Sequence, residues 1–365
     1  MISKRAYVPA IDVVRCFAAL SVTLFHLAIT WPHVAVPLKV LPPYPDMSFL
    51  NGYLYFGFVG VEIFFVISGF VIAASCQGRR PGDFFVGRAL RILPLLWTVV
   101  LAETVIHLVG GAPLMPTLVA AFRSMTIWPN GGWLNSVVWT LVPECVFYAV
   151  IWASLTTRVS TERALITIAY ALAIGCGAFQ LFSLAFGSPG GFLPTFLLLR
   201  HGAHLALGIA LWARSRGQAG LLPIFCMAIP GALLEINQQT LAYGQDAHVF
   251  YPAALPAAVW AAAVILIVYA SKRPSAELKP WVRIAGLVTF PIYLLHKTCG
   301  ALIVAAAFAA GVPAIPAVAL GMIATVAIAW ALVEFVEPIL RPIFRRGLEL
   351  VARHLNFARF AVQRP

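Results

Sequence analysis

Ten long apolar runs constrain this 365-residue sequence more than any other feature. A helix needs about 20 apolar residues to cross about 30 Å of hydrocarbon, and each run is near that length. The runs fall at roughly 8–30, 56–76, 90–110, 137–156, 165–186, 192–212, 219–237, 249–270, 284–309 and 315–341. They predict an all-α polytopic membrane protein, a bundle of about ten transmembrane helices. The stretch 114–127 is shorter and more polar, so we expect an interfacial or re-entrant segment there.

The composition excludes an ordinary water-soluble domain. Hydrophobic residues make up 61% of the chain and charged residues only 10%, whereas soluble domains carry roughly 25% charged residues. The first apolar run is long and contains Asp12, Arg15 and His26, so we interpret it as a retained helix and not as a signal peptide.

The positive charges predict the orientation of the helices. With the N-terminus inside, twenty of the 25 Lys and Arg residues fall in inward-facing segments, whereas only Lys39 and Arg123 fall in outward-facing ones. Positive charge is held on the cytoplasmic side, so both termini are predicted to be cytoplasmic and the protein to be multi-pass in a cytoplasmic membrane. The net charge of +12 then reflects contact with the lipid bilayer, and no nucleic-acid partner is implied.

The domain organisation is predicted to be simple. We expect one membrane domain over residues 1–345 and a short basic cytoplasmic tail over 346–365, with no internal repeat between them. Six cysteines lie within or beside the apolar runs without paired spacing. They are typical of small core residues, so neither a disulfide framework nor a metal site is expected.

The first apolar run carries two ionisable groups on one face. Arg15 and His26 are eleven residues apart, which is about 20° beyond three full helical turns and about 16 Å along the axis. Arg15 is expected in the inner half of the membrane and His26 near its outer boundary. Because lipid offers no partner to such groups, ionisable side chains inside a membrane favour a functional role.

Other polar groups are expected at a similar depth. At about 1.5 Å per residue, five of them fall roughly 10–15 Å below the outer surface, with His26 at or just above this level. They are Glu62, Glu103, Glu144, Arg200 and His296. If the helices bundle together, these groups form one buried polar cavity that opens outward.

Two further patterns lie on single helix faces. Arg88 and Arg91 are three residues apart at the inner mouth of the third run, and paired guanidinium groups suit phosphate. The alternative is that they only anchor the helix among lipid headgroups. Thr140, Glu144 and Tyr148 recur every four residues and predict a polar stripe on the fourth run.

Five blocks, in order along the chain, resemble one known family. IDVVRCFAALSVTLFH, GVEIFFVISGF, FFVGRALRILP, WTLVPECVFY and TFPIYLLH are similar to the signature blocks of integral membrane acyltransferase family 3. Members of that family transfer acyl groups, usually acetyl from acetyl-coenzyme A, to hydroxyls of sugars and other extracytoplasmic acceptors. One departure is Gly87, which stands where the family usually has a basic residue.

The resemblance implies roles for the polar residues. Cytoplasmic acyl-CoA, with acetyl-CoA as the expected donor and no metal cofactor, would bind its phosphates on Arg88 and Arg91, with Arg15. Its pantetheine arm would extend toward His26, the general base that activates a hydroxyl of a carbohydrate or glycolipid acceptor. Glu144 would orient or polarise that histidine or a second proton carrier, with Tyr148 donating to the developing oxyanion. Glu62, Arg200 and His296 are expected to bind the substrate. Direct transfer and an acyl-histidine intermediate both stay open.

Alternatives remain at three points. Ser68, within ISGF, looks like a nucleophile, but a Ser-Gly pair more often permits close helix packing. His201 and His204 have metal-ligand spacing, yet no further Cys or carboxylate lies near them in sequence, which favours a structural or acceptor-binding role. A secondary transporter or flippase could also use buried charges, although the sequence lacks the internal symmetry typical of transporters.

Overall fold

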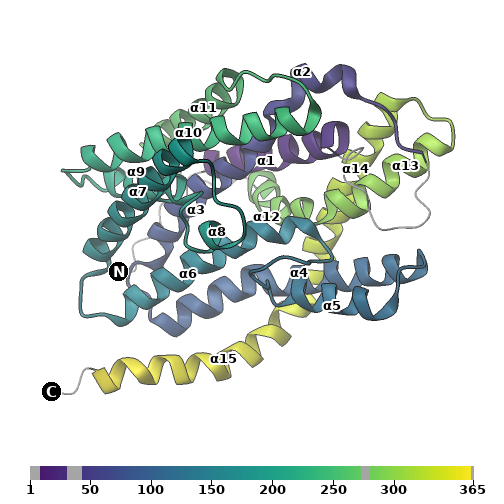
Figure 1. Cartoon of the computed structure of the whole chain (residues 1–365). Helices are drawn as coiled ribbons and strands as arrows, with labels where there is room; N and C mark the ends of the chain where they lie inside the picture. Colours follow the sequence, from purple (N-terminus) through teal and green to yellow (C-terminus); the bar gives the residue numbers. More distant parts are fainter. Residues whose placement is uncertain (1–8, 31–42, 273–279, 363–365) are drawn as a thin grey trace.

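The computed structural model describes residues 9–30, 43–272 and 280–362, and within these ranges the chain forms helices and no strand (Figure 1). The principal helices are α1 (Pro9–Phe25), α3 (Gly60–Cys76), α4 (Pro81–Val109), α5 (Leu114–Met125), α6 (Leu141–Thr156), α7 (Thr161–Phe186), α9 (Gly202–Ser215), α10 (Leu222–Ala247), α11 (Ala254–Ser271), α12 (Pro280–Leu295), α13 (Ala301–Ala309), α14 (Ala314–Ala331) and α15 (Glu337–Val362). Two short helices, α2 (Asn51–Leu54) and α8 (Leu193–Phe196), lie in connections.

Eight helical segments of the described chain are long and apolar enough to cross a membrane. They are Pro9–Ile29, Ser48–Cys76, Pro81–Val109, Ser136–Thr156, Thr161–Phe186, Ala254–Ser271, Trp281–Ala309 and Ala314–Arg353. The prediction of an all-α polytopic membrane protein is therefore confirmed. The placement of both termini in the cytoplasm stays a prediction.

The two other expected spans, 192–212 and 219–237, coincide with α8–α9 and α10, which do not meet those limits. Helix α9 has only 14 residues. Helix α10 has 26 residues, but Glu235 and the glutamines near it make it less apolar. Both helices still belong to the bundle, because α9 packs against α3 and α7, and α10 against α7 and α9. The two helices that are not long and apolar enough to span a membrane, α9 and α10, thus bring buried polar side chains such as His204 and Glu235 into the bundle.

Helix α9 lies at the centre of this packing. All its residues from Gly202 to Ala213 are buried, as its small and apolar sequence allows. It crosses α3 at Gly69 and Gly208, where the two backbones touch: a Cβ on Gly208 would overlap the carbonyl oxygen of Val66. The interpretation of the Ser68-Gly69 pair as a close-packing motif is confirmed at Gly69.

We expect replacement of Gly208 by alanine to destabilise the protein by about 3 kcal/mol or more, because the added methyl group meets backbone that moves only if α3 and α9 separate. The matched control is Gly177→Ala on α7, where a Cβ would meet nothing within 4 Å. Thermal unfolding of both variants in the same detergent tests this expectation. Equal melting temperatures would show that the crossing tolerates a side chain.

The last helix includes most of the segment 346–365 that the sequence predicts as a basic cytoplasmic tail. Helix α15 runs unbroken past residue 346 and packs along α4 at the lower side of the view in Figure 1. Its Ala352 is buried. The boundary expected at residue 345 therefore falls inside a helix that covers part of the bundle.

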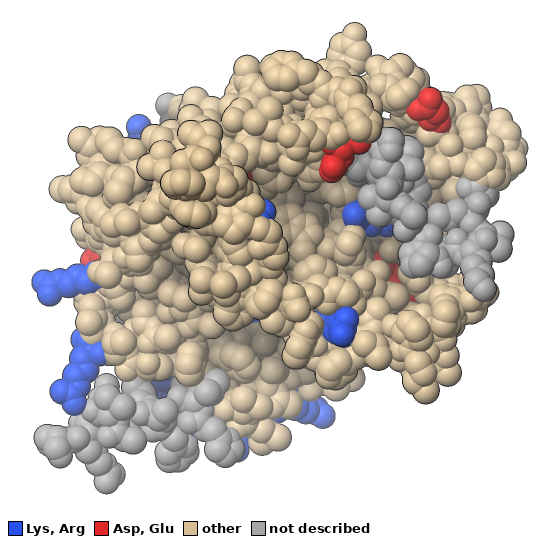
Figure 2. All heavy atoms as spheres, in the orientation of Figure 1, with Lys and Arg blue, Asp and Glu red and all other residues tan. Residues whose placement is uncertain are grey.

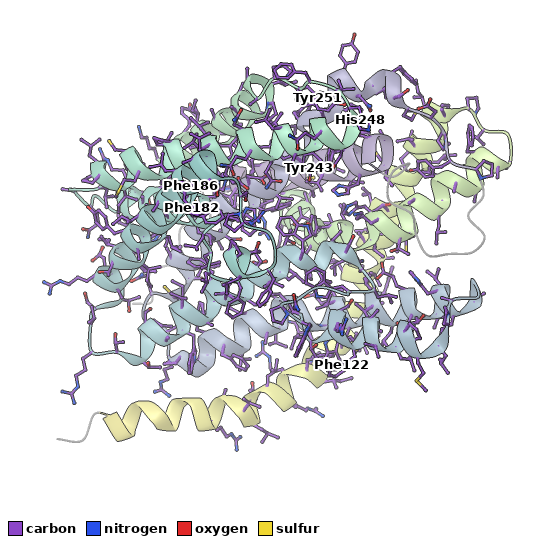
Figure 3. All side chains as sticks on the ribbon, viewed as in Figure 1. Phe122, Phe182, Phe186, Tyr243, His248 and Tyr251 are labelled. Atoms are coloured by element: carbon purple, nitrogen blue, oxygen red, sulfur yellow. The ribbon has the colours of Figure 1, made fainter. Side chains whose placement is uncertain are left out.

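The outer surface suits a lipid environment. Figure 2 shows a face that is mostly uncharged, with Lys and Arg side chains at its left and lower margins and a few near its centre, and with some Asp and Glu side chains at its upper right. Large apolar side chains are exposed on the helices, including Phe122 on α5 and both Phe182 and Phe186 on α7 (Figure 3). Helix α5, at the expected interfacial segment 114–127, packs along α4 and buries only Thr117, Ala121 and Ser124 of its own residues. A bilayer would cover such a surface.

Candidate functional site

A cavity of about 790 Å³ lies among α1, α3, α4, α6, α12 and α15. Its polar lining is dominated by arginine, which outnumbers the acidic residues. The arginines are Arg15, Arg79, Arg88, Arg91, Arg341, Arg345 and Arg353, and the acids are Asp83, Glu144, Glu337 and Glu349. The turn between α3 and α4, which the charge distribution predicts to be cytoplasmic, contributes Arg79 to this lining. The cavity is suited to an anionic ligand.

The predicted arginine pair lies in this cavity. Arg88 donates from Nη2 to Ser75 Oγ at 3.1 Å, and its guanidinium lies over the ring of Tyr148 at 5.7 Å. The guanidinium of Arg91 lies 5.8 Å from the ring centroid of Phe290. Aromatic packing fixes both planes while leaving their edges to bind. The pair therefore lines the cavity.

Three of the guanidinium groups that line this cavity have buried nitrogens without a hydrogen-bond partner among the described residues. These atoms are Arg15 Nε, Arg88 Nε and Arg91 Nη2. Buried polar groups are almost always paired, so several unpaired donors beside one cavity indicate a missing acceptor. A phosphate group, which accepts from several guanidinium nitrogens at once, matches this set.

The departure at Gly87 has a local counterpart. A Cβ on Gly87 would lie 3.5 Å from Arg79 Nη1. The Arg79 guanidinium thus occupies the space beside residue 87, where the similar family carries a basic side chain. The positive charge beside residue 87 therefore comes from Arg79 in the turn before α4, and not from a side chain at position 87.

A narrow pocket of about 80 Å³ continues from the cavity into the bundle. The two share five lining residues: Arg15, Ile67, Ser68, Arg91 and Glu144. The predicted stripe forms one wall of this route, since Thr140 and Glu144 line the narrow pocket while Glu144 and Tyr148 line the wide cavity. The Tyr148 hydroxyl donates to the Glu144 carboxylate.

A pair of histidines lies beyond the narrow pocket. Tyr293 lines that pocket, and its ring centroid is 5.5 Å from that of His296. The ring of His296 lies 5.0 Å from the ring of His26. Each histidine is the first residue of a π-helical segment, His26–Thr30 and His296–Gly300. Such segments re-aim side chains and are frequent at functional sites.

The hydrogen bonding of these histidines defines their chemistry. Nδ1 of His26 lies 3.0 Å from the Val22 carbonyl oxygen. A carbonyl only accepts, so the neutral ring carries its proton on Nδ1 and keeps the Nε2 lone pair free. His296 is fully buried, and neither of its ring nitrogens has a hydrogen-bond partner in the described chain. The pair can accept a proton and donate a hydrogen bond.

The other predicted site residues do not form the single polar layer that the sequence suggests. Glu62 lies with Gln239, whereas Glu103 accepts from Asn135 at 2.7 Å. Arg200 donates to the Pro189 carbonyl oxygen at 2.7 Å and lines none of the cavities described above. Depth along a helix does not fix the direction in which a side chain points, so groups at one level diverge to different neighbours.

The expected contact between Glu144 and His26 is also absent among the described interactions. Glu144 has Tyr148 as its partner and lies in the arginine-lined cavity, while the neighbour of His26 is His296. The Tyr148 hydroxyl donates its hydrogen bond to Glu144, and both residues line the wide cavity. Both residues therefore belong to the wall of the cavity and not to the immediate surroundings of His26.

Sequence reasoning missed the contribution of α15. Glu337, Arg341, Arg345, Glu349 and Arg353 all line the cavity. They recur every four residues, the spacing that places side chains along one helix face, and this periodicity could have predicted them. Arg341 also pairs with Glu337 at 3.0 Å, as the sequence spacing predicts.

Together the fold and the site define a polytopic membrane protein with a cationic cavity that narrows toward two neighbouring histidines, one buried and one half-buried. Residues 8–334 match the model of the Acyl_transf_3 family, which is described as an acyltransferase domain. The chain belongs to this acyltransferase family.

Known proteins resemble parts of the chain. Over 211 residues it is 26% identical to "Putative peptidoglycan O-acetyltransferase YrhL" of Bacillus subtilis (strain 168), covering 51% of this chain and 29% of that protein. Over 112 residues it is 36% identical to "Exopolysaccharide production protein ExoZ" of Rhizobium meliloti (strain 1021), covering 27% and 34%. Over 109 residues it is 27% identical to "Peptidoglycan O-acetyltransferase OatA" of Listeria monocytogenes serovar 1/2a (strain ATCC BAA-679 / EGD-e), covering 28% and 14%.

The matched segments span well under half the length of each of these relatives. No solved structure matches the chain significantly.

Proposed function

We propose that the protein is a membrane O-acyltransferase. It moves an acyl group, with acetyl as the expected one, from cytoplasmic acyl-CoA to a hydroxyl of a polysaccharide or related sugar at the outer side of a bacterial cytoplasmic membrane. The observation that carries the proposal is the arginine-lined cavity of about 790 Å³ continued by a pocket of about 80 Å³ toward His296 and His26. The names of the relatives, which include O-acetyltransferases and an exopolysaccharide production protein, support the acceptor class.

The shape of the route suits the shape of coenzyme A. The wide cavity accommodates the phosphorylated nucleotide, whose phosphates accept from Arg88, Arg91 and Arg15. The pantetheine arm is a thin, flexible chain that fits the narrow pocket lined by Thr140, Phe290 and Tyr293. Its thioester is thereby delivered past Tyr293 toward the histidine pair.

The transfer then needs one proton to move. Nε2 of His26 removes the proton from the acceptor hydroxyl while the oxygen forms a bond to the thioester carbonyl carbon. The carbon–sulfur bond breaks, and the same proton passes from His26 to the leaving thiolate. His296, whose nitrogens lack a partner in the described chain, donates a hydrogen bond to the carbonyl oxygen as it gains negative charge.

The experiment uses sealed inside-out membrane vesicles that contain the full chain. They are supplied with radiolabelled acetyl-CoA outside and a polysaccharide acceptor inside. We expect alkali-labile label on the acceptor, in amounts that depend on the protein. The experiment is repeated with a panel of polysaccharide and lipid-linked sugar acceptors. If no acceptor gains more label than in vesicles without the protein, the proposed function is wrong.

We expect Arg79→Ala to weaken coenzyme A binding about tenfold, because one charge-assisted hydrogen bond contributes about 1.5–3 kcal/mol and each 1.4 kcal/mol is tenfold in affinity. Calorimetric titration of the purified protein with coenzyme A measures the effect. The double variant Arg79→Ala/Gly87→Arg should recover affinity, since it returns a cation to the same space. Unchanged affinity in the single variant would show that Arg79 does not meet the donor.

A further inference from the structure

Four ionisable side chains meet inside the bundle, away from the route described above. Glu62 comes from α3, His201 directly precedes α9, His204 lies on α9 and Glu235 on α10. The Glu235 carboxylate binds both imidazoles, with Oε1 at 3.0 Å from His201 Nδ1 and Oε2 at 2.9 Å from His204 Nε2. All four residues are at most 3% exposed. We call this set the Glu/His cluster.

Glu62 completes the cluster with an unpaired atom. Its Oε2 is buried without a hydrogen-bond partner among the described residues. One potential ligand atom from each of Glu62, His201 and Glu235 lies within 4.8 Å of the other two. Three helices thus aim oxygen and nitrogen donors into one small volume.

With both carboxylates ionised, the negative charge of the Glu/His cluster needs compensation. No Lys or Arg of the described chain forms an ion pair with Glu62 or Glu235. Two carboxylates in the interior of a membrane protein are costly unless a positive charge lies between them. A divalent cation with two neutral imidazoles and two carboxylates gives a site of zero net charge.

We propose that the Glu/His cluster binds one divalent transition-metal ion of the zinc type. Imidazole nitrogens with carboxylate oxygens are a donor set that zinc accepts in four-coordinate sites, whereas calcium and magnesium prefer oxygen alone. The isolated sequence disfavoured a metal at His201 and His204 because no third ligand lay nearby. The fold supplies Glu235 and Glu62 from other helices.

The surroundings support the donor positions. Nε2 of Gln239 donates to Glu235 Oε1 at 2.6 Å and to Glu62 Oε1 at 3.2 Å, so it ties the two carboxylates together. Hydrogen bonds of this kind orient metal-ligating carboxylates. Aromatic rings enclose the imidazoles: Phe65 stacks on His201 at 5.0 Å, and Trp260 lies 5.6 Å from His204.

The ion has a structural role. Phe65 lines the narrow pocket on one side and stacks on His201 on the other, so a side chain separates the ion from the proposed donor route. None of the four cluster residues lines the cationic cavity or the narrow pocket. Binding would join α3, α9 and α10, which carry the centre of the bundle, and stabilise the folded protein by mass action.

The test measures metal and needs no acyl transfer, so it stands apart from the proposed function. The full chain is purified in detergent, incubated with zinc, desalted and analysed by inductively coupled plasma mass spectrometry. Wild type is expected to hold about one ion per chain, and Glu235→Gln less than about a tenth of that. The matched control is Glu103→Gln, which removes a buried carboxylate outside the cluster and should bind zinc like wild type.

Thermal unfolding gives an independent readout. Zinc should raise the melting temperature of wild type and of Glu103→Gln, and leave that of Glu235→Gln unchanged. If Glu235→Gln does not fold, His204→Gln replaces it. Wild type that retains no zinc would overturn the proposal, and so would equal zinc retention in wild type and in a folded cluster variant. The cluster would then be a hydrogen-bonded network without an ion.

Discussion

Replacing His26 by alanine is expected to lower acyl transfer at least about 100-fold, the lower end of what a positioned general base contributes. The reason lies in the ring itself. Its Nδ1 is bound to the Val22 carbonyl oxygen at 3.0 Å, which leaves the Nε2 lone pair to accept the proton of the acceptor hydroxyl. Alanine removes that lone pair, and His296 cannot take its position, because its own ring is held 5.0 Å away.

The measurement compares initial rates of label transfer from radiolabelled acetyl-CoA in vesicles with equal amounts of protein. Coenzyme A affinity is measured on the same variant and should stay at the wild-type value, because His26 does not line the donor cavity or the narrow pocket. The matched control is His248→Asn, since His248 is an exposed histidine with a left-handed backbone that asparagine tolerates. A His26→Ala rate within tenfold of this control would exclude His26 as the base.

Features that depend on one helix alone were predictable from the sequence. The spacing of Arg88 and Arg91 places both in one cavity, and the stripe of Thr140, Glu144 and Tyr148 lines one wall. Periodicity within a helix fixes which side chains share a face, whatever packs against it. The all-α membrane architecture is predictable for a similar reason, because backbone groups in lipid must be satisfied within each helix.

Features that depend on which helices are neighbours were not predictable. The single polar layer expected from depth divides into separate sites, because Glu62 turns toward α10 and Glu144 toward the arginines of α4. The placement of His26 beside His296 depends on two π-helical segments, which simple helical arithmetic does not foresee. The contact between Glu235 and His201 could not be predicted from spacing, because the two residues are 34 positions apart in the chain and only the fold brings them together.

The second large effect is expected at Arg91. This residue lines both the wide cavity and the narrow pocket. In the proposed donor route it stands where the phosphorylated part of coenzyme A would give way to the pantetheine arm. Its Nη2 is buried without a partner in the described chain, and the ring of Phe290 holds its guanidinium plane. A group already fixed in place loses little freedom when it binds, and its charge is screened less there than at the surface.

Arg91→Ala should therefore reduce coenzyme A affinity by about 10- to 100-fold, the range for a lost charge-assisted hydrogen bond, with a parallel loss of transfer at low donor concentration. Arg91→Lys should recover only part of the affinity, because an ammonium keeps the charge but offers no planar fork to bind phosphate in two places. The matched control is Arg214→Ala: Arg214 is exposed, does not line the cavity, and belongs to the same predicted cytoplasmic side. Equal coenzyme A affinity in Arg91→Ala and Arg214→Ala would mean that the arginines act only through overall charge and that the donor enters by another path. A loss confined to Arg91→Ala would instead place the phosphates at the junction of the two spaces, which sets how far the thioester reaches toward the histidines.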